Sequence, residues 1–218
     1  MSSVPDPAPE PAPPLTHLVI LGHPSGHSFN AALAQVYVET VERHGQQAQL
    51  RDLYAMGFNP LLSEDERVAN NIAMLPADAR HELDLAQASD IVTFIYPIWF
   101  GAPPAIIMGF VDRVFGAAAK SIDFYTPSRS PFAGKRLVTI STSGASQAWL
   151  EDRGIWDSLR KSYNHYLESV AGFARSEHYH ADEISDTLNP TRASRIKLEV
   201  AAFAEQICLA KARVAPPG

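Results

Sequence analysis

The chain has 218 residues, 46% of them hydrophobic, and a formal net charge of −6. A chain of this size can bury the hydrophobic core of one domain. Its lysine and arginine side chains form no continuous run, so we expect no binding to nucleic acid. Its apolar runs are too short for membrane insertion, and the N-terminus shows no signal peptide. The single cysteine cannot form an intrachain disulfide, so the cytoplasm is the expected location.

Proline dominates the first part of the chain. Residues 1–14 contain six prolines and few side chains that a core could bury. Such a segment gains too little from burial to offset the entropy lost on ordering, so we predict a disordered tail. The folded domain is expected to span residues 15–214.

Strand-like and helix-like patterns alternate along this domain. Apolar runs predict strands at residues 15–21, 47–53, 90–96, 135–141 and 173–180. Helical spacing predicts helices at 29–44, 76–88, 104–119 and 147–171, the last with a break near Gly154, and a final helix that Asn189 caps; long loops are expected at 54–76 and 120–134. This alternation predicts an α/β, flavodoxin-like fold, with five parallel strands in the order 2-1-3-4-5 and helices on both faces.

The first candidate site is the turn GHPSGHSFN at residues 22–30, before the first helix. Backbone N–H groups at a helix N-terminus lack partners and favour a phosphate. The turn adds imidazole, hydroxyl and amide donors from His23, Ser25, His27, Ser28 and Asn30. It has neither the glycine fingerprint of dinucleotide sites nor a P-loop lysine. The alternative is an ordinary turn in which Ser28 caps the helix.

Two further loops follow the third and fourth strands. The segment PIWFG at residues 97–101 holds flat side chains at the carboxyl end of a buried strand, where open α/β sheets bind ligands. The segment STSGAS at 141–146 lets a ring approach the backbone closely. The alternatives are that the aromatic residues plug the sheet edge and that the second segment is a solvated loop. Because all three loops meet at one edge, we expect them to share a flat ligand such as a flavin.

With these segments in view, the chain resembles the flavodoxin-like NAD(P)H:quinone oxidoreductases of the DT-diaphorase type. The resemblance covers about residues 16–180. It is carried by SFN at 28–30, DLYAMGFNPLLS at 52–63, YPIWFGAPPAIIMGFVDRVF at 96–115 and, more loosely, TSGAS at 142–146.

The resemblance implies a bound flavin, FAD in most members and FMN in near relatives. It also implies reduction by NADH or NADPH, two-electron transfer to a quinone-like acceptor in the same pocket by a ping-pong mechanism, and a homodimer. The flavin itself would carry the hydride, and Trp99 and Phe100 would form apolar walls. The predicted flavin-binding residues are His23, Ser25, His27, Ser28, Phe29, Asn30, Pro97, Ile98, Trp99, Phe100, Gly101, Thr142, Ser143, Gly144 and Ala145.

The chain departs from the family pattern at one point. Leu150 and Trp156 align with a tyrosine and a histidine that balance charge on the reduced flavin in the animal enzymes, and neither residue ionises. This departure leaves open a regulatory flavoprotein that binds a partner in a transport system. Two further alternatives are an electron-carrying flavodoxin, against which the long loop at 54–76 argues, and an azo-dye or flavin reductase.

Two other charged patterns are interpreted as structural. His178 and His180 lie on one face of the last predicted strand, but a pair without a third ligand is a weak metal signal. We therefore expect no metal and interpret both as surface or dimer-contact residues. Asp112 and Arg113 are expected to form exposed or half-exposed ion pairs on a helix.

Overall fold

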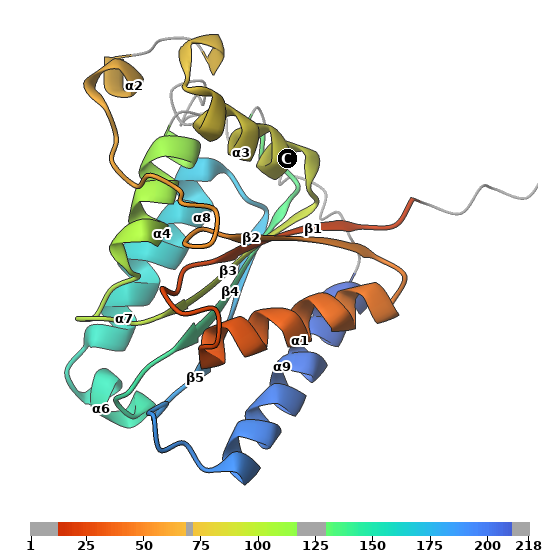
Figure 1. Cartoon of the computed structure of the whole chain (residues 1–218), viewed down its shortest axis with the longest axis vertical. Helices are drawn as coiled ribbons and strands as arrows, with labels where there is room; N and C mark the ends of the chain where they lie inside the picture. Colours follow the sequence, from red (N-terminus) through yellow and green to blue (C-terminus); the bar gives the residue numbers. More distant parts are fainter. Residues whose placement is uncertain (1–12, 69–71, 117–129, 211–218) are drawn as a thin grey trace, which may run out of the picture.

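The computed structural model describes residues 13–68, 72–116 and 130–210, and contains a five-stranded parallel sheet in the order β2-β1-β3-β4-β5 (Figure 1). The predicted fold class and strand order are confirmed. The strands are β1 (Thr16–Leu21), β2 (Gln47–Asp52), β3 (Ile91–Pro97), β4 (Arg136–Thr142) and β5 (Arg175–Ala181). The predicted tail lies mostly outside the described residues, and so do the end of the helix predicted at 104–119 and most of the loop that follows it.

Helices cover both faces of the sheet. One face carries α1 (Phe29–Arg43) and α9 (Pro190–Leu209), which pack against each other. The opposite face carries α3 (Ala77–Ala88), α4 (Ala105–Phe110), α7 (Ile155–Leu159) and α8 (Tyr166–Ala171), with α6 (Gln147–Asp152) beside them (Figure 1). The predicted helix at 147–171 breaks at Gly154, whose positive φ of 65° caps α7.

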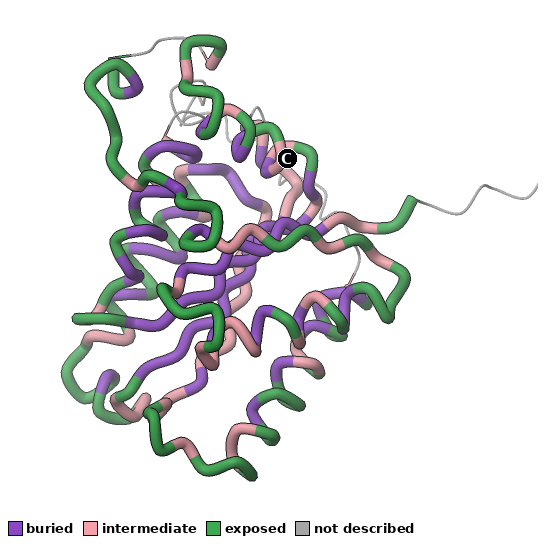
Figure 2. Tube along the Cα trace, viewed as in Figure 1, coloured by how far each residue is buried: buried purple, intermediate pink, exposed green. Residues whose placement is uncertain are grey.

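The sheet separates two apolar cores, and its central strands are buried along their whole length (Figure 2). Branched side chains such as Val19 and Ile140 face α1 and α9. Aromatic rings dominate the other core, where Phe115 and Phe132 lie 4.9 Å apart between ring centroids. Burial on both faces explains why β3 is a continuous apolar run rather than an alternating pattern.

The segment after β2 is more ordered than the predicted long loop. It contains α2 (Glu64–Val68) and a short 3-10 turn (Ile72–Met74). Arg113 fixes this region, because its guanidinium contacts Glu66 at 2.7 Å and Asp78 at 2.7 Å. The prediction of an exposed pair was therefore wrong for Arg113, which is buried, whereas Asp112 is exposed. Its partners lie 47 and 35 residues away in the chain, beyond the reach of local pattern analysis.

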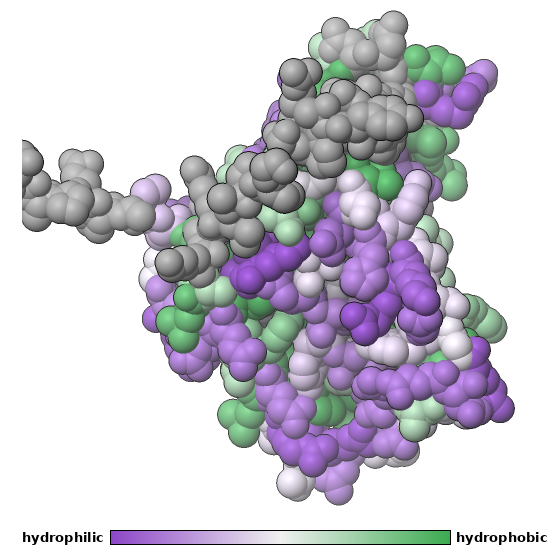
Figure 3. Space-filling view, turned by 180° about the vertical axis from the view of Figure 1, so that it is seen from behind, coloured by the Kyte–Doolittle hydropathy of each residue, from purple (hydrophilic) through white to green (hydrophobic). Residues whose placement is uncertain are grey.

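The surface seen from behind carries a broad hydrophilic area across its middle, and its hydrophobic side chains gather in separate patches (Figure 3). Within the parts of the chain that the structure describes, no helix combines the length and apolar character needed to cross a bilayer. Single apolar side chains on such a surface need no functional explanation.

Candidate functional site

A cavity of about 500 Å³ lies at the edge of the sheet where the strands end. The loops after β1, β3, β4 and β5 converge on it, as expected at the switch point of a doubly wound sheet. Its lining residues are His23, Ser25, His27, Ser28, Phe29, Asn30, Pro97, Ile98, Trp99, Thr142, Ser143, Gly144, Ile184, Ser185 and Asp186. Three of the four loops were predicted from sequence to meet here.

The N-terminus of α1 opens on this cavity. Ser28 caps the helix, since its Oγ accepts a hydrogen bond from the Ala31 amide at 3.1 Å and its carbonyl accepts one from Ala32. The amides of Phe29 and Asn30 are left without an intrahelical acceptor. The capped turn and the anion site are thus compatible, because the cap satisfies one amide and leaves two for a ligand.

Asn30 contributes a further unsatisfied donor. Its side chain is buried, and its Oδ1 accepts a hydrogen bond from Thr142 Oγ1 at 3.1 Å. Its Nδ2 has no hydrogen-bond partner among the residues that the structure describes. A buried donor left unpaired costs free energy, so its presence at a cavity indicates a place for an acceptor on a ligand.

The loop after β3 forms a tight turn. Trp99 and Ala102 exchange backbone hydrogen bonds of 3.0 and 3.1 Å, and the two residues between them, Phe100 and Gly101, have φ of 52° and 77°. This geometry directs Phe100 into solvent, where it is fully exposed. Phe100 does not line the cavity of this single chain, and its role as an apolar wall stays a prediction. Trp99 does line the cavity, with its ring 5.8 Å from that of His23.

The remaining predicted residues divide in the same way. Thr142, Ser143 and Gly144 line the cavity, but neither Gly101 nor Ala145 does. The Ala145 carbonyl instead accepts hydrogen bonds from Ser143 Oγ and from the Glu183 amide, at 2.6 and 3.3 Å. It therefore shapes the loop rather than the cavity surface.

The loop after β5 was missed by sequence analysis. Ile184, Ser185 and Asp186 complete the cavity, and the Ile184 amide donates to the Ser143 carbonyl at 2.8 Å. The signal was available, because these residues directly follow the fifth strand and must emerge at the same edge as the other loops.

Two imidazoles lie near the cavity, and one of them, that of His180, contacts the lining residue Ser143. Ser141 Oγ lies 2.7 Å from His178 Nε2 and 2.8 Å from His180 Nδ1, and Ser143 Oγ lies 3.1 Å from His180 Nε2. Burial lowers the pKa of His178 to about 3 and that of His180 to about 4, so both are neutral at pH 7. Both residues are half-buried and lie against Trp156, so neither is a freely exposed surface residue, and the expected dimer contact stays a prediction.

Leu150 and Trp156, which align with the tyrosine and histidine of the animal enzymes, have packing roles. Trp156 lies against the His178 and His180 rings, with centroids 5.0 and 4.7 Å away. Leu150 is buried. No cluster of three or more metal-ligating side chains occurs among the described residues, although two histidines lie close together.

The fold and the position of this cavity define a protein of the flavodoxin-like class. A family model for the flavodoxin-like fold matches residues 16–207, and the chain belongs to this family. Its relatives place it among the NAD(P)H oxidoreductases. It is 33% identical over 156 residues to an uncharacterized NAD(P)H oxidoreductase of Haemophilus influenzae, a match that covers 70% of this chain and 74% of that protein.

Two further comparisons agree. The chain is 31% identical over 158 residues to NAD(P)H dehydrogenase (quinone) 1 of Cavia porcellus, across 63% of this chain and 56% of that protein; it therefore spans just over half the length of this relative. The solved structure of the NAD(P)H:quinone oxidoreductase from Methanothermobacter marburgensis superposes with a TM-score of 0.76 at 20% identity, covering 89% of this chain and all of that one. The resemblance predicted from sequence is confirmed, and the chain is an enzyme of the NAD(P)H oxidoreductase family.

The residues of the cavity fit a flavin. The free amides of α1 and the Asn30 amide suit a phosphate, and Trp99 offers a flat apolar surface beside the backbone of Gly144. Thr142 and Ser143 add hydroxyl groups at the end of β4. The cavity thus combines anion-binding groups with a flat apolar surface.

Proposed function

We propose that this protein binds a flavin in the cavity and uses NAD(P)H to reduce quinones or similar flat acceptors by two electrons. The observation that supports this most directly is the N-terminus of α1 at the cavity, where the Phe29 and Asn30 amides lack intrahelical acceptors and the buried Asn30 side chain has an unpartnered Nδ2. When bound, the flavin supplies the redox chemistry, accepting a hydride from NAD(P)H and passing two electrons on.

The protein's own residues bind and orient. The first turn of α1 holds the phosphate, with His23 and His27 at the rim as further donors. Trp99 stacks against one side of the flat ring and excludes water there. Backbone amides near Gly144 and Ala145 would stabilise negative charge on the ring, as preorganised donors do in other enzymes. A cavity that NAD(P)H and the acceptor occupy in turn would give ping-pong kinetics.

The proposal includes a homodimer, a cytoplasmic location and FAD as the first choice of flavin, with FMN as the second. Phe100 supports the dimer, because its phenyl group, fully exposed in a left-handed turn beside the cavity, would be covered by a second copy of the chain. Cys208, a buried free thiol, fits a reducing compartment.

The decisive experiment is to purify the protein, record its absorption spectrum and weigh the released cofactor. We expect a flavin spectrum, bleaching by NADPH under anaerobic conditions, and parallel double-reciprocal lines with a benzoquinone. Colourless, folded protein that takes up neither FMN nor FAD would refute the proposal. Bound flavin without NAD(P)H-dependent quinone turnover would refute the activity alone, and would favour a regulatory flavoprotein.

A pair of variants tests the cavity itself. Gly144→Phe places a large ring where the flavin would lie, and it should abolish flavin binding while the protein still unfolds cooperatively. Leu198→Phe adds the same ring at an exposed position on α9 and should bind flavin normally. Equal flavin affinity in both variants would show that the flavin binds elsewhere.

A further inference from the structure

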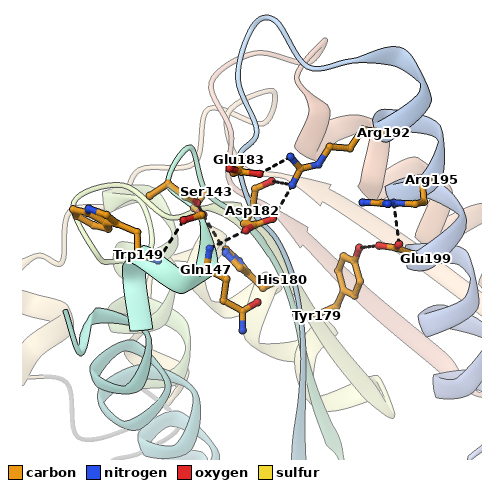
Figure 4. A network of polar contacts seen from close by, with 12 residues as sticks. Ser143, Gln147, Trp149, Tyr179, His180, Asp182, Glu183, Arg192, Arg195 and Glu199 are labelled. Atoms are coloured by element: carbon orange, nitrogen blue, oxygen red, sulfur yellow. Dashed lines mark hydrogen bonds and ion pairs between the residues drawn. The ribbon is translucent and has the colours of Figure 1, made fainter. Parts of the chain in front are cut away.

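A row of polar side chains, two buried serines and two half-buried histidines, runs inward from the cavity wall. On one side are Ser143 and Ser141 of the β4 edge, and on the other are His180 and His178 of β5 (Figure 4 shows the first contact, between Ser143 and His180). The pairing of the strands places Ser141 directly beside His180. Polar groups placed beside the apolar side chains of this core cost free energy unless they are hydrogen-bonded, so a row of four linked polar side chains requires an explanation.

The hydrogen bonds along this row of side chains can be donated in one consistent direction. Ser143 Oγ donates to the Ala145 carbonyl at 2.6 Å, so it must accept from His180 Nε2–H. The unprotonated Nδ1 of neutral His180 then accepts from Ser141 Oγ–H, and Ser141 Oγ accepts from His178 Nε2–H. This leaves Nδ1 of His178 as an acceptor, and it is buried without a partner among the described residues.

We propose that the chain His178–Ser141–His180–Ser143 is a proton relay that places a positive charge on His180 when negative charge arrives in the cavity. The inference rests on the proposed function, because the negative charge is the one that a hydride from NAD(P)H leaves on the bound flavin. His180 acts through Ser143 and is therefore a positioning residue for charge rather than a group that contacts the reacting atoms.

The transfer balances atom by atom. A proton from water binds Nδ1 of His178, the Nε2 proton of His178 moves to Ser141 Oγ, and the original Ser141 hydroxyl proton moves to Nδ1 of His180. His178 and Ser141 stay neutral, and His180 carries one positive charge. Both electrons come from the hydride, so the relay moves protons only.

The groups around the two rings are consistent with this role. Burial lowers the pKa of both histidines, and Asp182 partly opposes this at His180, while His180 and Arg160 lower the pKa of His178 further. Asp182 is itself held by Arg192 at 2.8 Å and by the Gln147 amide at 2.8 Å (Figure 4). Trp156 covers both rings. Asp182 is thus fixed by other contacts, and new negative charge in the cavity would raise the pKa of His180.

The test counts protons. Flavin-loaded protein is reduced electrochemically at pH 8 in weak buffer, and proton uptake is followed with an indicator dye. We expect two protons per two electrons in the wild type and one in Ser141→Ala, which interrupts the chain. The matched control is Thr139→Val, which removes a buried hydroxyl two residues away that bonds Asn164 and no histidine. It should still take up two protons.

A second measurement does not depend on whether the Ser141→Ala variant folds. Nitrogen-15 NMR of the flavin-loaded wild type should show both His180 nitrogens protonated after reduction and one before it, with the signals assigned from His180→Gln. One proton per two electrons in the wild type, two in Ser141→Ala, or an unchanged His180 spectrum would each overturn the relay while the flavin function stands. Protein that binds no flavin would overturn both.

Discussion

Each face of the sheet buries a hydrogen-bonded chain that contains histidine, and the two chains end differently. On the α1 side, His17 Nδ1 lies 3.0 Å from the Tyr37 hydroxyl, which also accepts from Thr93 at 3.1 Å, and His17 Nε2 lies 2.8 Å from Gln46 Oε1. Gln46 in turn donates to the Cys208 carbonyl. Every donor in this chain has an acceptor, and none of its residues reaches the cavity.

The chain on the other face has one end at the cavity, at Ser143, and one end without a partner, at His178 Nδ1. A complete network stabilises one arrangement, because any added or removed proton leaves a buried group unpaired. A network with an unpaired acceptor can take up a proton and has two arrangements. We infer that the first chain serves the fold and the second serves the site.

The largest expected effect is on acid stability. Burial lowers the pKa of His17 to about 4, whereas in the unfolded chain it returns to the ordinary value of about 6.5. The unfolded state therefore binds the proton first, and stability falls as pH drops from about 6.5 to 4, by roughly 3 kcal/mol for this residue. Urea unfolding at pH 5, 6 and 7 should show a shallower pH dependence for His17→Gln than for the wild type. Identical dependences would contradict the assignment.

Tyr37→Phe should cost about 2 kcal/mol of folding stability, because it leaves His17 Nδ1 and Thr93 without their partner in a fully buried place. Chemical denaturation measures the loss. Flavin affinity should not change, since Tyr37 is not part of the cavity. If Tyr37→Phe lost flavin without losing stability, the hydrogen-bonded chains of His17 and of His180 would not be separate in function.

Asn30→Ala should weaken flavin binding about tenfold, or about 1.4 kcal/mol, because it removes the unpartnered donor at the cavity. Fluorescence titration with FMN and FAD gives the affinity. Gln35→Ala, an exposed position on the same helix, is the control and should bind as the wild type does. Unchanged affinity in Asn30→Ala would mean that the Asn30 amide serves the fold alone.

The smallest loss of folding stability is expected at Gln46, the outer end of the hydrogen-bonded chain that contains His17. Gln46 is half-buried, so in Gln46→Ala water can replace its contact with His17 Nε2, and the cost should be about 0.5–1 kcal/mol. Thermal unfolding at pH 7 tests this. A cost larger than that of Tyr37→Phe would contradict the view that the buried centre of this chain carries its stability.

Much of the fold followed from local patterns. The order of the strands and the break at Gly154 were predictable, because helical and strand periodicity and right-handed crossovers act over short stretches of chain. The pattern His178-Tyr179-His180 also placed two imidazoles on one face of a strand. It could not reveal Ser141 between them, since that contact depends on the register between β4 and β5.

The sequence by itself determined which loops meet, because parallel strands joined by right-handed crossovers bring their carboxyl ends to one edge. The tertiary structure decided which side chains meet there and in the cores. Asn30 contacts Thr142 across 112 residues of chain, and Arg113 turns inward to partners far away in sequence. Such contacts depend on packing between distant elements, which adjusts to the shape of every neighbour and leaves no periodic trace in the chain.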